Sequence, residues 1–142
     1  MSVAVPDSNE SPKPRTVLVV EDEVLIRWMV CEELRLAGMR AIEAKNAHEA
    51  ISILETAAEI DLVFTDVRMP GGMDGLRLSA LIRERWPSLR IIIGSAEFLQ
   101  PATLAVADAF VQKPYNVERL IVEVRSVLGD EHEHQNKTGK QH

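Results

Sequence analysis

The chain is poor in several kinds of residue, and each shortage excludes a class of protein. It has one cysteine, Cys31, which rules out an internal disulfide and suits a reducing compartment. Basic residues number 16 against 22 acidic ones, which disfavours a surface that grips nucleic acid or an anionic membrane. No apolar run approaches the roughly 20 residues of a membrane span. We therefore expect a cytoplasmic protein with no direct nucleic-acid binding and no membrane insertion.

Two further signals are missing at the amino-terminal end. Segment 1–15 has no apolar core of the signal-peptide type, and its prolines and polar residues are typical of a disordered lead-in. No Gly-x-Gly-x-x-Gly follows the first apolar run, which disfavours a dinucleotide enzyme. The 142 residues are most simply one domain over 16–128, followed by a polar tail over 129–142.

Between these ends, short apolar runs alternate with segments of helical periodicity. Strands are predicted over 16–20, 40–44, 62–66, 90–95 and 110–112. Helices are predicted over 23–37, 47–58, 74–86, 97–107 and 117–128, and Leu76, Ala80 and Leu81 are the expected core side of the third. The helix over 97–107 has the weakest signal because it contains Pro101. Five strands alternating with five helices predict an α/β fold with a parallel, doubly wound sheet.

Polar side chains stand where four of these strands end: Glu21 and Asp22, Asp66, Ser95, and Lys113. In a doubly wound sheet the carboxyl ends of the strands meet at one edge, which is where ligands bind. Two like charges about 4 Å apart repel by roughly 4 kcal/mol at an effective dielectric near 20. One lysine is too little to offset three carboxylates, so a divalent cation with oxygen ligands is predicted, and Mg²⁺ fits best.

A Mg²⁺ site beside a lysine and a hydroxyl contains the parts needed for phosphoryl transfer, which depends on positioning and charge neutralisation. Asp66 is the candidate nucleophile and would form an aspartyl phosphate. If Asp66 stood alone, it could equally be a capping residue of the turn that follows.

The motifs resemble those of the receiver domain of two-component response regulators, over about 16–128. They occur in the family's order: 19–22, Asp66 with 69–70 and 73–75, 95–96, and 113–114. The resemblance implies a flavodoxin-like sheet of strand order 2-1-3-4-5 with five helices. Two departures stand out: Glu21 occupies a position where Asp is more frequent, and the 69–74 loop is one residue longer than the commonest form.

The resemblance also implies roles for individual residues. Asp22, Asp66 and the backbone carbonyl of Arg68 would bind Mg²⁺ directly, and Glu21 would act through a water. Lys113 would pair with the phosphoryl oxygens, and its bond to Pro114 would be cis.

A conformational switch is implied as well. Ser95 would swing in to hydrogen-bond the phosphoryl group, and Phe110 would turn inward as Ser95 moves. On its own, Phe110 is better explained as a core aromatic, so its switching role rests on the resemblance.

The function implied is that of a stand-alone signalling receiver rather than a turnover enzyme. A sensor histidine kinase or a histidine phosphotransfer protein would donate the phosphoryl group to Asp66. Because only a short polar tail follows Leu128, the output is expected through contact with a downstream protein or by passing the phosphoryl group onward.

Two other functions compete with this one. A phosphatase of the haloacid dehalogenase type also uses a nucleophilic Asp and Mg²⁺, but it requires a second Asp two residues later, where this chain has Arg68. A receiver-shaped binding module that no longer takes phosphate is the other alternative, and the intact acidic set with Lys113 counts against it.

Leu25 and Trp28 lie off the main apolar stripe of the helix predicted over 23–37. They would either be buried against a neighbouring element or form a docking surface for a helical partner beside the acidic pair. We favour the docking surface.

Overall fold

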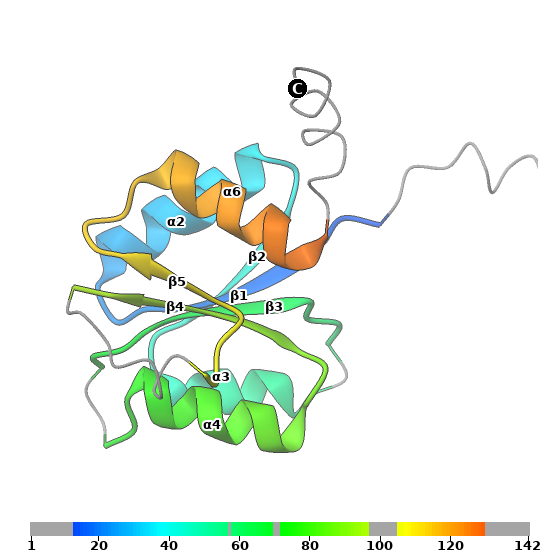
Figure 1. Cartoon of the computed structure of the whole chain (residues 1–142), viewed down its shortest axis with the longest axis vertical. Helices are drawn as coiled ribbons and strands as arrows, with labels where there is room; N and C mark the ends of the chain where they lie inside the picture. Colours follow the sequence, from blue (N-terminus) through cyan, green and yellow to red (C-terminus); the bar gives the residue numbers. More distant parts are fainter. Residues whose placement is uncertain (1–12, 57, 70–71, 97–104, 130–142) are drawn as a thin grey trace, which may run out of the picture.

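A computed structural model describes residues 13–56, 58–69, 72–96 and 105–129. In this part of the chain a five-stranded sheet lies between two layers of helices (Figure 1). Helices α2 (Val24–Leu36) and α6 (Val117–Leu128) cover one face of the sheet, and α3 (Ala47–Leu54) and α4 (Gly75–Arg85) cover the other. None of the described helices is long and apolar enough to cross a membrane.

The sheet confirms the predicted topology. Its strands are β1 (Thr16–Val20), β2 (Arg40–Ala44), β3 (Leu62–Asp66), β4 (Arg90–Ser95) and β5 (Ala109–Gln112). They are all parallel, in the order β2-β1-β3-β4-β5. The strands β1 and β3 are buried along their whole length, as expected for central strands covered on both faces.

The described residues contain four helices where five were predicted. Most of the missing helix, predicted over 97–107, lies outside the described residues, and its last part, 105–107, is a turn. Helix α3 also ends at Leu54, four residues before the predicted end at Ala58. There the backbone N–H and the hydroxyl of Thr56 both donate to the Ile53 carbonyl, at 3.1 and 2.6 Å, in a turn tighter than that of an α-helix.

Alternation along the strands divides the core into two parts. Val17, Val19, Leu62 and Phe64 face α2 and α6, whereas their neighbours Leu18, Val20 and Val63 face α3 and α4. The same alternation decides on which face of the sheet each polar side chain at a strand's carboxyl end lies.

The predicted core side of α4 was right only in part, because Leu76 packs against the core from a partly buried position. Ala80 is exposed, and the buried side of the helix is formed by Gly75, Leu78, Ser79 and Ile82. The close approach of Gly75 to β3 explains the difference, since a Cβ at Gly75 would lie 1.9 Å from the Asp66 carbonyl oxygen. This contact fixes the rotation of α4, so that Leu78 and Ile82 point at the sheet.

Candidate functional site

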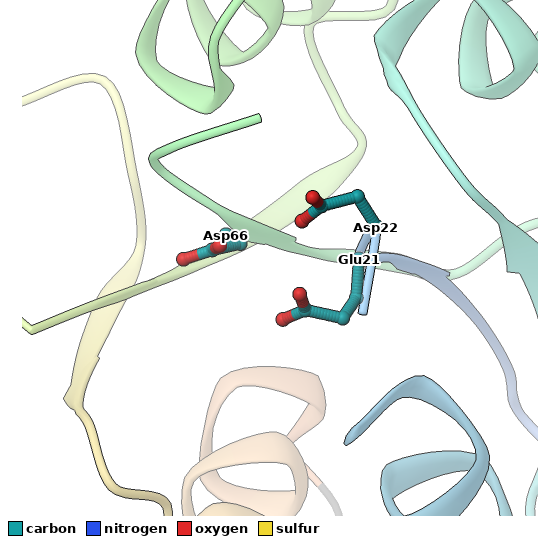
Figure 2. Close-up of side chains that lie close together, drawn as sticks. All are labelled: Glu21, Asp22 and Asp66. Carbon is teal, nitrogen blue, oxygen red and sulfur yellow. The ribbon is translucent and has the colours of Figure 1, made fainter. Parts of the chain in front are cut away.

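Three carboxyl groups lie together at the carboxyl end of the sheet. Glu21 and Asp22 follow β1, and Asp66 is the last residue of β3, the strand paired with β1. One carboxylate oxygen from each of the three lies within 4.8 Å of the others. Figure 2 shows that Glu21 and Asp22 leave the end of β1 on opposite sides, and that both extend toward the side where Asp66 lies. Pairing of two strands in register therefore brings together acids that are 44 or more residues apart in sequence.

Burial makes this cluster electrostatically costly. Glu21 is 1% exposed and Asp66 5% exposed, and Asp22 is half-buried. By strand alternation Glu21 and Asp66 continue the row of Val19 and Phe64, so both belong to the face covered by α2 and α6. Charged carboxylates in such a place require partners of opposite charge.

Lys113 is the cation that lies against this cluster. Its Nζ atom is 3.1 Å from Asp66 Oδ2 and 3.7 Å from Glu21 Oε1. The backbone N–H of Lys113 donates to the Ser95 carbonyl at 2.9 Å, which ties the residue to the end of β4. The Lys113–Pro114 peptide bond is cis, as expected.

The pKa values follow from burial and from this pairing. Burial raises the pKa of Glu21 to about 7, although the backbone N–H of Glu23, 3.1 Å from Oε2, opposes the shift. Burial also raises the pKa of Asp66 against the effect of the Lys113 hydrogen bond. For Lys113, burial lowers the pKa, but the hydrogen bond to Asp66 and the nearby carboxylates outweigh it and leave the pKa raised. Lys113 is therefore a permanent cation, whereas Glu21 titrates near neutrality.

The residues of the cluster fit a hard divalent cation. All three groups offer oxygen ligands, the kind that Mg²⁺ prefers. Within the described residues, the buried Oε1 atom of Glu21 has no hydrogen-bonding partner. A metal ion or a water bound to a metal ion would satisfy this oxygen and offset the excess negative charge.

The predicted switch residues lie on the opposite face of the sheet. Ser95 ends β4 and is buried, and it continues the row of Ile91 and Ile93, which faces α3 and α4. Phe110 is partly buried and packs against the same part of the core. Arg68 is exposed two residues after Asp66, and Pro70 and Gly71 lie outside the described residues.

The sequence analysis gave no role to Gly94 or Tyr115, and it placed Gly75 in the 73–75 motif without predicting its contact. Gly75 lies against the Asp66 backbone, and Gly94 is the β4 residue in register with Asp66. The ring of Tyr115 occupies the space beside Gly94. A glycine inside an otherwise β-branched strand often marks a close approach, and that signal could have identified Gly94.

A family model for the response regulator receiver domain matches residues 17–125, which is most of the chain. The chain belongs to the response regulator receiver family. Phosphorylation on an aspartate and binding of Mg²⁺ are general to this family.

Similar proteins support the same assignment. The receiver is 32% identical over 117 residues to a cyclic di-GMP phosphodiesterase of Thermotoga maritima, covering 80% of this chain and 31% of that protein. It is 31% identical over 123 residues to the DNA-binding transcriptional regulator NtrC of Salmonella typhimurium, covering 84% of this chain and 26% of NtrC. The chain thus spans only about a quarter to a third of these relatives.

A solved structure gives the same picture. The response regulator protein TrrA of Thermotoga maritima, in complex with Mg(2+)-BeF, is 31% identical to this receiver and superposes with a TM-score of 0.73. The alignment covers 80% of this chain and 98% of TrrA.

Glu21 makes the metal-free receiver sensitive to pH. Its pKa in the folded protein, about 7, is above the ordinary value of 4.5, so folding favours the protonated form. The stability that this preference contributes is full below about pH 4.5 and is lost as the pH rises through about 7. With a chelator present to remove metal ions, the Glu21→Gln variant should have a free energy of unfolding higher than that of the wild type by on the order of 1–3 kcal/mol near pH 8.

Urea unfolding of both proteins near pH 5 and near pH 8 measures this effect, and Glu118→Gln, an exposed change on α6, controls for the lost charge. The Glu21→Gln advantage should shrink at the lower pH. An advantage of equal size at both pH values would contradict the assignment.

Proposed function

We propose that Asp66 accepts a phosphoryl group from a phospho-histidine of a sensor histidine kinase or a histidine phosphotransfer protein. The observation that carries the proposal is the direct contact of a buried Asp66 carboxylate with Lys113, inside a cluster of three carboxyls. In the reaction, an Asp66 oxygen bonds to phosphorus while the bond from phosphorus to the imidazole nitrogen breaks. The nitrogen keeps the electron pair and takes up a proton.

Each residue of the cluster has a part in this transfer. Lys113, 3.1 Å from Asp66 Oδ2, pairs with the phosphoryl oxygens as they arrive. Asp22, Asp66 and the backbone carbonyl of Arg68 would hold Mg²⁺, with Glu21 acting through a water. The metal would neutralise charge on the phosphoryl oxygens and on the carboxylates around them.

The response to phosphorylation is proposed to involve Ser95 and Phe110. Ser95 would turn to hydrogen-bond the phosphoryl group, and Phe110 would move inward as Ser95 leaves its resting position. Both residues face α3 and α4, so the change would be transmitted on that side of the sheet.

We assign this receiver no turnover activity. The second carboxylic acid of a haloacid dehalogenase-type phosphatase is replaced here by the exposed Arg68. The output would be contact with a downstream protein in the cytoplasm, without direct binding of nucleic acid.

The phosphoacceptor role is tested by incubating the protein with acetyl phosphate and Mg²⁺ and analysing it by intact-mass spectrometry. We expect addition of one phosphoryl group that is lost in Asp66→Asn and strongly reduced in Asp22→Asn or with a chelator. Asp61→Asn, at the start of β3, is the control carboxylate. No addition to the wild-type protein, or an addition that survives in Asp66→Asn, would show that the proposal is wrong.

A docking surface for the phosphodonor is proposed at the amino-terminal end of α2. Leu25 is 79% exposed and Trp28 57% exposed, and Val24 is exposed beside them. The helix begins two residues after Asp22, so this apolar surface borders the carboxylate cluster. A helical partner that presents a phospho-histidine could bury these side chains while its imidazole reaches Asp66.

Trp28→Ala should slow phosphotransfer from a phospho-histidine protein about tenfold or more, because a buried aromatic is a typical interface anchor. The acetyl phosphate reaction and the melting temperature should change little, since Trp28 is mostly exposed. Leu36→Ala is a matched control, because Leu36 is also 79% exposed but lies at the other end of α2. Equal effects of the two substitutions, or a large loss of stability in Trp28→Ala, would rule out the docking surface.

A further inference from the structure

Two buried polar side-chain atoms have no hydrogen-bonding partner among the described residues: Glu21 Oε1 and the hydroxyl oxygen of Tyr115. Metal binding accounts for the first of them. The second has no part in the proposed function so far, and it belongs to the residue that follows Lys113–Pro114. A buried hydroxyl without a partner destabilises the folded state, so its presence requires an explanation.

The Tyr115 hydroxyl lies beside the phosphoacceptor strand. A Cβ on Gly94 would come within 2.4 Å of the hydroxyl oxygen, so the ring fits only because position 94 has no side chain. Gly94 is paired in register with Asp66, and both residues belong to the face covered by α2 and α6. The hydroxyl therefore lies over β4 next to the position from which the Asp66 side chain projects.

Two ring contacts hold Tyr115 in this place. Its ring meets Phe64, two residues before Asp66 on β3, edge to face with centroids 5.2 Å apart. The Lys113 ammonium is 5.6 Å from the centre of the Tyr115 ring. A phenylalanine would keep both contacts without burying a hydroxyl. The packing alone thus does not explain the tyrosine.

The surroundings keep the hydroxyl protonated. Burial raises the pKa of Tyr115 far above its ordinary value, and the negative charges of Asp66 and Glu21 raise it further. A hydroxyl that stays protonated next to carboxylate oxygens can donate a hydrogen bond to an acceptor placed beside it.

We propose that the Tyr115 hydroxyl is a positioning group that donates a hydrogen bond only after Asp66 has been phosphorylated. When a phosphoryl group is added to Asp66, the Lys113 ammonium is drawn toward the phosphoryl oxygens and its bond to Asp66 Oδ2 weakens. The Tyr115 hydroxyl, beside Asp66 on the same face, then donates to an oxygen of the acyl phosphate. This inference rests on the proposed function and adds to it a residue that stabilises the loaded state.

The test compares the wild-type protein with Tyr115→Phe, which removes only the hydroxyl. Melting temperatures are measured without ligand and then with Mg²⁺ and beryllofluoride, a mimic of the phosphoryl group. Without ligand, the variant should be as stable as the wild type or more stable, because it loses a polar atom that has no partner. With the mimic, its gain in stability should be smaller, corresponding to about five- to tenfold weaker binding.

A spectroscopic readout tests the hydrogen bond itself. Tyr115 is the sole tyrosine of the chain, so a protein labelled with ¹³C at the tyrosine ζ carbon gives one resonance. This resonance should shift when Mg²⁺ and beryllofluoride are added together, and it should shift less with Mg²⁺ alone.

The outcomes separate this inference from the proposed function. If the wild type gains no stability from Mg²⁺ and beryllofluoride, the phosphoacceptor role fails and the inference fails with it. If the wild type gains stability and Tyr115→Phe gains as much, or if the ζ-carbon resonance does not move, only the inference is overturned. An equal loss of stability in the free and loaded forms of Tyr115→Phe would show a purely structural role and would also overturn it.

Discussion

The shortage of positive charge around three neighbouring carboxyls is the constraint on which the rest of this structure depends. Lys113 contacts Asp66 and lies near Glu21, but one ammonium cannot neutralise all three groups. Burial, together with the neighbouring charge of Asp66, raises the pKa of Glu21 to about 7, so that this carboxyl is partly protonated near neutrality. A divalent cation bound to the three carboxyls, as proposed, would supply the missing positive charge before and after a phosphoryl group is added.

Because side chains alternate along each strand, the two faces of the sheet carry different sets of the candidate functional residues. Glu21, Asp66, Gly94 and Tyr115 belong to the face covered by α2 and α6, where the phosphoryl group would be received and held. Ser95 and Phe110 belong to the face covered by α3 and α4, where the proposed response would spread. Because Gly94 and Ser95 are adjacent on β4, the end of this strand would link the proposed phosphoryl site on one face to the proposed response on the other.

Local patterns of apolar residues predicted most strands and helices, but they did not predict the contacts between these elements. The bounds of β1 and β4 follow from β-branched runs, and those of α6 follow from a helical apolar stripe and from Gly129, whose φ of +78° ends the helix. The buried side of α4 was ambiguous, because apolar residues lie on more than one side of this helix. The contact of Gly75 with β3 selects the side that carries Leu78 and Ile82. The packing of Tyr115 on Gly94 depends on how the chain returns after β5, and no local pattern reports it.

If the carboxyl cluster holds Mg²⁺ as proposed, Glu21 would have to lose its proton when the metal binds. Calorimetric titration of Mg²⁺ near pH 7, in buffers that differ in their heat of ionisation, measures metal binding and proton release together. Since the pKa of Glu21 is about 7 in the metal-free protein, we expect Mg²⁺ to bind with release of a fraction of one proton. The release should disappear in Glu21→Gln. Binding without proton release in the wild type, or no binding of Mg²⁺, would contradict the account.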